Sequence, residues 1–144
     1  MFYRTIKGTI RKNKQIKMYE NIREEELKNK IAQDFFPDFD CAKIIGNIDF
    51  AATIHKSDLF AETESVFWAE AKKGKSDIYK SIVQLILTIG KARTFDQVIP
   101  PAFLGAFDAE KMAFVPYSAV QEIFYQNDFN WNVTPSNYET RDKR

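Results

Sequence analysis

Residues 66–72, VFWAEAK, restrict the fold more than any other stretch of this chain. Alternate residues of a strand face opposite sides, so Val66 and Trp68 would share one face, and Phe67 and Ala69 the other. Both faces are apolar near the start of this run, which predicts a central strand that is covered on both sides. Such a strand requires further layers above and below it. We therefore expect an α/β fold with a mixed central sheet flanked by helices.

The remaining sequence supplies elements of both kinds. Apolar residues at helical spacing predict helices at 20–36, from about 77 to 93 with Ser76 as its N-cap, and at 118–124. Strand patterns occur at 42–54 and 66–72, and twice within 100–117 around a turn at 108–111. Residues 55–65 would connect the first two strands as a hairpin. The expected order is helix, strand, strand, helix, strand, strand, helix.

The central strand ends in an acid and a base, Glu70 and Lys72, which would lie on the same face. They come at its carboxyl end, where α/β folds tend to keep their sites. A charged pair at the end of a buried strand costs desolvation free energy unless something pairs with it. Glu-x-Lys alone is a short pattern, and a strand that runs out into solvent would also explain it.

A second acid, Asp49, interrupts the apolar run of residues 47–54, NIDFAATI. If the two strands are neighbours, Asp49 approaches Glu70, and a divalent cation would relieve the repulsion between the two carboxylates. Lys72 would point to the same place, where it could orient a water or offset charge on a phosphate. The alternative for Asp49 is a turn or edge-strand aspartate that pairs with a lysine.

Composition further restricts the kinds of catalytic and metal site that this chain can form. His55 and Cys41 are the only histidine and the only cysteine in the 144 residues. These counts argue against a histidine-containing triad, a histidine-rich metal site and a cysteine-based zinc site. Any metal would have oxygen ligands, which favours magnesium, manganese or calcium. The lack of a secretory segment at the start, and of an apolar stretch of roughly 20 residues, predicts a cytoplasmic protein that does not enter a membrane.

Charge is unevenly spread, although the net charge is only +1. Residues 1–19 hold six Lys and Arg residues and no acid. Such an arm suits a phosphate backbone, although a solvated terminus would look the same. We expect a single domain over residues 1–144, with a basic arm at 1–19, a core at 20–128 and a polar tail at 129–144 that leads to a further domain.

The chain has an acid in one strand, Glu-x-Lys in the next strand and then a helix. This pattern resembles that of the PD-(D/E)XK nuclease superfamily. The resemblance covers most of the chain, and the matching residues are Asp49, Glu70, Lys72 and Gln84. The proline of the superfamily's name is missing, because Ile48 precedes the aspartate. The resemblance implies a restriction-endonuclease-like core of the αβββαβ type.

The resemblance also implies a magnesium-dependent deoxyribonuclease, with Mn²⁺ able to replace Mg²⁺. The implied metal ligands are the carboxylates of Asp49 and Glu70, the Ala71 carbonyl and an acid of the first helix. For that acid we choose Glu24, which continues the inward-facing stripe of the helix toward its start. Glu20 continues the same stripe and Glu25 lies close by, so both remain alternatives.

The other implied roles belong to residues downstream. Lys72 would position the attacking water, and Gln84 would help to arrange the site unless it belongs to a solvated helix face. Lys73 and Lys75 would bind the DNA backbone, and further basic residues flank the site: Lys80, Lys91 and Arg93. Ordinary surface charge is the alternative for all of these cations.

More narrowly, the chain resembles the N-terminal nuclease domain of restriction-modification enzymes that carry a DNA methyltransferase in the same chain. This implies linked methyltransferase or specificity domains, and two copies of the domain for double-strand cleavage. Two other functions stay open: a module on the same fold that binds nucleic acid or another protein without cleavage, and a structure-specific or repair nuclease. The non-cleaving module predicts that Asp49, Glu70 and Lys72 do not converge, or that Lys72 forms a structural ion pair.

Overall fold

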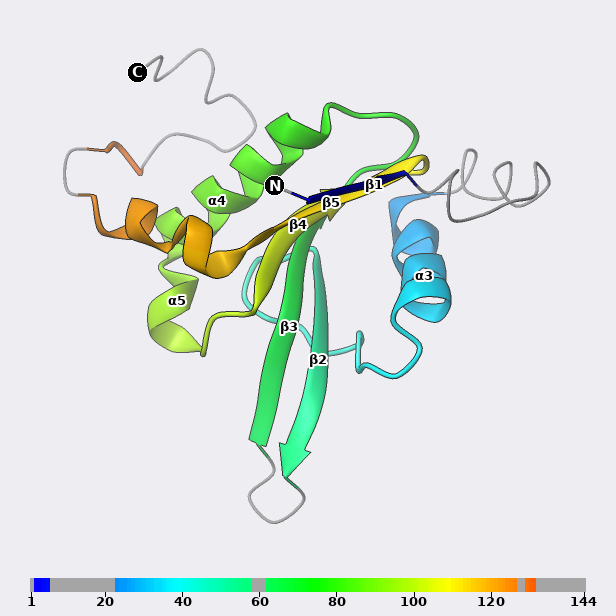
Figure 1. Ribbon diagram of the computed structural model, residues 1–144, viewed down its shortest axis with the longest axis horizontal. Coiled ribbons are helices and arrows are strands. Elements are labelled where there is room, and N and C mark those ends of the chain that lie inside the picture. The colour runs from blue at the N-terminus through cyan, green and yellow to red at the C-terminus, as the bar shows by residue number, and fades with distance from the viewer. Residues whose placement is uncertain (1, 6–22, 58–61, 127–128, 132–144) are drawn as a thin grey trace.

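A single mixed sheet organises the chain, with strand order β1-β5-β4-β3-β2 (Figure 1). The computed structural model describes residues 2–5, 23–57, 62–126 and 129–131. The strands are β1 (Phe2–Thr5), β2 (Phe50–Ser57), β3 (Glu62–Ala71), β4 (Phe103–Phe107) and β5 (Lys111–Pro116). β3 and β4 run parallel and all other neighbours are antiparallel. The predicted mixed α/β architecture is therefore confirmed.

Helices cover both faces of the sheet, and two of them lie where the sequence pattern predicted them. They are α3 (Glu24–Phe35), α4 (Ile78–Ala92), α5 (Thr94–Gln97), η1 (Tyr117–Ala119) and η2 (Gln121–Tyr125). The long helices α3 and α4 match two of the predictions, although residues 20–22 lie outside the described part. The predicted helix at 118–124 is instead two short 3-10 helices, and α5 was not predicted. None of the helices in the described ranges combines the length and the apolar character that crossing a membrane requires.

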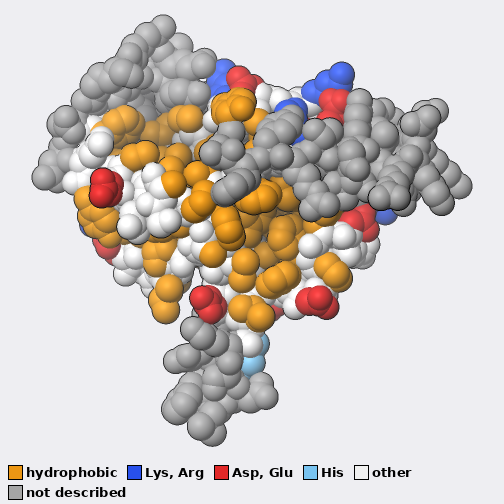
Figure 2. Space-filling model, in the orientation of Figure 1, with side chains coloured by type: hydrophobic (Ala, Val, Ile, Leu, Met, Phe, Trp, Pro, Cys, Tyr) orange, Lys and Arg blue, Asp and Glu red, His pale blue; other side chains and the backbone are white. Residues whose placement is uncertain are grey.

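The predicted central strand is β3, which lies between β2 and β4 and is buried on both faces, as its sequence predicted. Phe67 and Ala69 pack in one core layer with Leu27 of α3. Trp68 packs in the opposite layer with Leu85 of α4. Apolar side chains also gather across the middle of the face shown in Figure 2, with charged side chains toward its margins. β3 is thus the element to which both layers of the fold are attached.

The prediction of a strand over 42–54 is wrong in its first half. β2 begins only at Phe50, and the preceding segment turns at Gly46, which has a φ of +50°. Ile45 and Ile48 are both buried in the core layer of Trp68. Residues three apart in a strand would face opposite sides, so the turn is what brings both isoleucines to one core. Asp49 consequently lies in the bend before β2 rather than inside a strand.

Two further boundaries differ from the sequence prediction. β2 extends to Ser57 and β3 starts at Glu62, so the connection between them is shorter than 55–65. The N-cap of α4 is Asp77 rather than Ser76, because the Asp77 carboxylate accepts hydrogen bonds from the N–H groups of Tyr79 and Lys80. Of the basic arm, residues 2–5 form β1 and pair with β5. The rest of the arm and the tail beyond residue 131 lie outside the described residues.

Trp131 packs against α4 at Gly90. A Cβ added at Gly90 would overlap the Trp131 ring, so only glycine permits this close approach. The same ring stacks on Phe124, with centroids 6.0 Å apart. Glycine is otherwise unfavourable inside a helix, by roughly 1 kcal/mol relative to alanine. Glycine at position 90 therefore lowers the stability of the helix but permits the packing of Trp131.

We expect Gly90→Ala to lower the free energy of unfolding by about 1–3 kcal/mol, because the new methyl group overpacks the ring. Chemical denaturation of the variant and the wild type measures this. In a Trp131→Ala background the overlap is gone, so the same glycine substitution should be neutral or stabilising. An equal loss in both backgrounds would show that the ring is not the cause.

Candidate active site

The acid and the base at the end of β3 form an ion pair. The Lys72 Nζ lies 3.4 Å from the Glu70 Oε1, and the two side chains are 36% and 15% exposed, respectively. They therefore stand at the border between the core and solvent. The backbone N–H of Lys72 donates to the Phe107 carbonyl at 3.0 Å, which extends the parallel pairing with β4 to this point. The strand does not fray into solvent where the charges begin.

Asp49 lies beside the end of β3, on the side of β2. Phe50, the first residue of β2, pairs with Ala69, so Asp49 lies just before the first paired residue of β2. The Ala71 N–H donates to the Asp49 Oδ2 at 3.3 Å, which takes the place of a further ladder bond. The structure therefore brings Asp49 to the end of β3 although the residue is not part of a strand.

Negative charge is in excess around Glu70. Burial, the charge of Asp49 and, more weakly, that of Glu24 together raise the pKa of Glu70 to about 7, against the opposing effect of Lys72. One lysine therefore does not compensate the carboxylates that meet here. A group of this kind either holds a proton near neutral pH or is neutralised by a cation.

The first-helix acids differ in their surroundings. Glu24 is the first residue of α3, and its charge acts on Glu70. Glu25 forms an ion pair with Lys28 at 2.6 Å. Glu20 lies outside the described residues. Of the two acids that can be compared, Glu24 is the one that the fold directs toward the site.

Lys28 is a residue of this region that the sequence pattern did not single out. Its Nζ donates to the Asp49 carbonyl at 3.2 Å, and its side chain is only 18% exposed. Because the segment before β2 is not held in the sheet, this hydrogen bond is a tether between α3 and Asp49. The Glu25–Lys28 spacing is an ordinary helical pair, so no local signal points from Lys28 to Asp49.

The oxygen atoms at the end of β3 suit a hard divalent cation. The N–H and C=O groups of one strand residue point to the same edge, so the Ala71 carbonyl is directed to the side of Asp49. Within the described ranges, no three Asp, Glu, His or Cys side chains form a metal-binding group by themselves. Two carboxylates and one carbonyl would leave positions for water, which is the coordination that Mg²⁺ favours.

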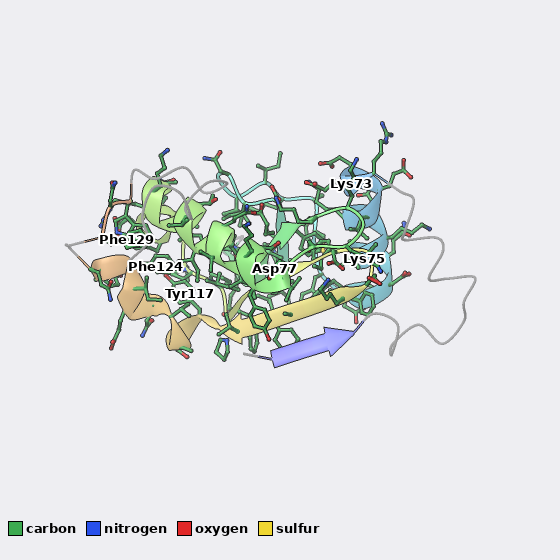
Figure 3. All side chains as sticks on the ribbon, turned by 90° about the horizontal axis from the view of Figure 1, so that it is seen from above. Lys73, Lys75, Asp77, Tyr117, Phe124 and Phe129 are labelled. Atoms are coloured by element: carbon green, nitrogen blue, oxygen red, sulfur yellow. The ribbon has the colours of Figure 1, made fainter. Side chains whose placement is uncertain are left out.

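Asp49, Glu70 and Lys72 form a cluster at the end of β3. The other predicted residues are less closely tied to this cluster. Gln84 is half-buried on α4, and no hydrogen bond between described residues joins its side chain to the cluster. Lys73 and Lys75 lie in the loop after β3, at the α3 end of the molecule (Figure 3). The Lys75 Nζ is 3.8 Å from Glu110, and the side chain is 80% exposed. Both lysines are therefore accessible to a phosphate backbone.

The prediction that Lys91 and Arg93 flank the site is wrong. They belong to the far end of α4, a helix whose 15 residues span about 22 Å. Arg93 forms an ion pair with Asp96 at 2.7 Å and lies over the Phe95 ring. These contacts give Arg93 a structural role at the opposite end of the molecule.

Asp108 fixes the loop that follows Lys72. It is fully buried and accepts hydrogen bonds from the Ser76 N–H at 2.9 Å and the Ser76 hydroxyl at 2.8 Å. Its other donors belong to the turn between β4 and β5: the N–H groups of Glu110 and Lys111, and the Lys111 Nζ. The sequence showed a turn here but not its partner, because Ser76 lies 32 residues away.

Comparisons with family models, with curated proteins and with solved structures give no match to this chain. The assignment of a function therefore rests on the geometry of the site and on the residue pattern alone.

The raised pKa of Glu70, caused by burial first and by Asp49 second, predicts a stability effect in the metal-free protein. Between about pH 4.5 and about pH 7, native Glu70 keeps a proton that the unfolded chain has lost. The free energy of unfolding should therefore fall as the pH rises through this window. Glu70→Gln removes this titration, so its stability advantage over the wild type should grow between about pH 5 and about pH 8.

Denaturation with a chelator present, at both pH values, measures this advantage. Glu122→Gln, on the exposed surface of η2, is the matched control for the loss of one negative charge. Growth of equal size in the control would contradict the role of Glu70. Mg²⁺ should stabilise the wild type at about pH 8 but not Glu70→Gln, because a cation at this place would bind the charged carboxylate.

Proposed function

We propose that this chain is the cleavage domain of a magnesium-dependent DNA endonuclease. The observation that carries the proposal is the meeting of Asp49, Glu70 and Lys72 at the carboxyl end of the central strand. Two acids and a lysine in this arrangement agree with the PD-(D/E)XK pattern read from the sequence. DNA is the substrate to which Lys73 and Lys75 are suited, since both lie in the exposed loop beside the cluster.

Each residue of the cluster has a role in the proposed hydrolysis. Asp49, Glu70, the Ala71 carbonyl and Glu24 would hold the metal. The metal would lower the pKa of a bound water and offset charge on the phosphate. Lys72 would leave its ion pair with Glu70 and hold the attacking water in line with the phosphorus. The proposed reaction is a single displacement by water, without a covalent intermediate.

A non-cleaving module would also contain an ion pair between Glu70 and Lys72. A pair with a purely structural role, however, would be expected to hold the pKa of its carboxyl group low. Here burial and Asp49 raise the pKa of Glu70 despite the lysine. This imbalance favours a site that awaits a cation over a completed structural pair.

The biological setting proposed here follows the narrower resemblance. The domain would act in the cytoplasm as the cleavage module of a restriction-modification enzyme, with methyltransferase or specificity domains linked to it. Two copies would pair to cut both strands. A structure-specific or repair nuclease is the second candidate, because it would use the same residues for the same chemistry. A preference for branched or single-stranded DNA would favour it.

We expect Lys72→Ala to lower metal-dependent cleavage of supercoiled plasmid by at least about 100-fold, because the attacking water loses the group that holds it. Gel analysis of nicked and linear products, with Mg²⁺ or Mn²⁺, measures this. Lys91→Ala is the matched control, since it removes the same charge from an exposed position at the far end of α4. Equal activity of the two variants would contradict the role of Lys72.

The metal site can be tested without cleavage. Mn²⁺ should bind the wild type, and Asp49→Asn should weaken this binding by about tenfold or more, because a charged oxygen ligand is lost. Isothermal titration at about pH 8 measures both affinities. If neither plasmid cleavage nor Mn²⁺ binding is found for the wild type, the non-cleaving module becomes the better account.

A further inference from the structure

A groove adjoins the candidate active site. It lies between α3 and two stretches of the chain, residues 41–44 and 48–51, and its volume is about 570 Å³. This volume falls in the usual range of small-molecule sites, roughly 300–1,000 Å³. Asp49 is one of the lining residues, so the groove and the carboxylate cluster are continuous. If a phosphate of a nucleotide is bound at Asp49, the neighbouring part of that nucleotide would lie at the groove.

The charges that line the groove do not suit a second phosphate. Lys28 belongs to the lining, but Glu25 cancels its charge at 2.6 Å, and its Nζ also donates to the Asp49 carbonyl. Lys43 is the remaining cation of the lining, which also contains the acidic residue Asp49. A phosphate backbone requires an excess of positive charge, which the loop after β3 provides and the groove lacks.

The other lining groups suit a heterocyclic base. Ile44, which is 85% exposed, and Ala32 contribute apolar surface against which a ring can pack. Asn29 and Gln33 stand four residues apart on α3, so their side chains project from the same side of the helix, and both are exposed. A side-chain amide offers a donor and an acceptor side by side, which is the pairing that base edges require.

We propose that this groove receives the nucleobase next to the scissile phosphate, unstacked from its neighbours. The inference rests on the proposed nuclease function and names its substrate as DNA that is single-stranded or opened at the cleavage position. A base inside a closed duplex could enter only after it left its stack, at a cost of free energy. Asn29 and Gln33 are then specificity-determining residues, and the neutral lining separates the base from the phosphates.

The test uses a labelled single-stranded oligonucleotide with one abasic residue in its middle, cleaved with Mn²⁺. We expect the wild type to cut along the strand, but about tenfold less at one bond beside the abasic residue, where the groove finds no base. The double variant Asn29→Ala/Gln33→Ala should cut more slowly and without this gap. Asn47→Ala/Gln121→Ala is the matched control on exposed positions outside the groove, and it should keep the gap.

The outcomes separate the two proposals. A complete ladder without a gap in the wild type leaves the nuclease standing and overturns the groove inference. A gap that persists in Asn29→Ala/Gln33→Ala also overturns it. No cleavage of any DNA by the wild type, together with no Mn²⁺ binding, overturns the nuclease and the groove inference with it.

A second measurement does not depend on cleavage. The dinucleotide d(pTpT) is titrated into the metal-free protein while side-chain amide signals are followed by NMR. The signals of Asn29 and Gln33 should shift, and that of Asn47 should not. Unchanged signals of Asn29 and Gln33 up to millimolar dinucleotide would contradict the inference.

Discussion

The burial of β3 on both faces is the constraint on which the rest of the structure depends. α3 packs on one side of this strand and α4 on the other. α4 also provides the crossover that makes β4 parallel to β3, so that both strands end at the same edge of the sheet. The loop after Lys72 and the turn at Asp108 therefore meet there. Loops and charged side chains therefore converge at the carboxyl ends of β3 and β4.

Two acids at this edge show how differently a fold can treat a carboxylate. Asp108 is fully buried, yet five hydrogen-bond donors surround it and hold the neighbouring loops. Glu70 is less buried, faces one lysine, and has two acids near it. The hydrogen-bonding capacity of the Asp108 carboxylate is thus satisfied, and its role is structural. Around Glu70 the positive charge of one lysine does not balance the carboxylates. Such an imbalance is typical of groups with a role in binding or catalysis.

Local pattern predicted most of the elements because each depends on neighbouring residues. The apolar periodicity of α3 and α4 and the alternation along β3 placed these elements within a few residues of their observed ends. The errors arose where a distant partner intervened. Ser76 did not cap α4, because Asp108 binds its hydroxyl and Asp77 takes the cap. Asp49 did not continue a strand, because Gly46 turns the chain so that Ile45 and Ile48 reach one core.

The sequence by itself determined that an acid and a base would end a buried central strand, since alternation along a strand is a local property. The same property assigned Trp68 to one core layer and Phe67 to the other. Only the tertiary structure decided that Asp49 reaches Ala71, that Glu24 rather than Glu25 acts on Glu70, and that Lys28 tethers the segment before β2. These contacts depend on how α3 packs beside β2 and on a turn that no periodic pattern encodes. The groove along α3 has the same origin, because a cavity is a property of packed surfaces and not of either surface alone.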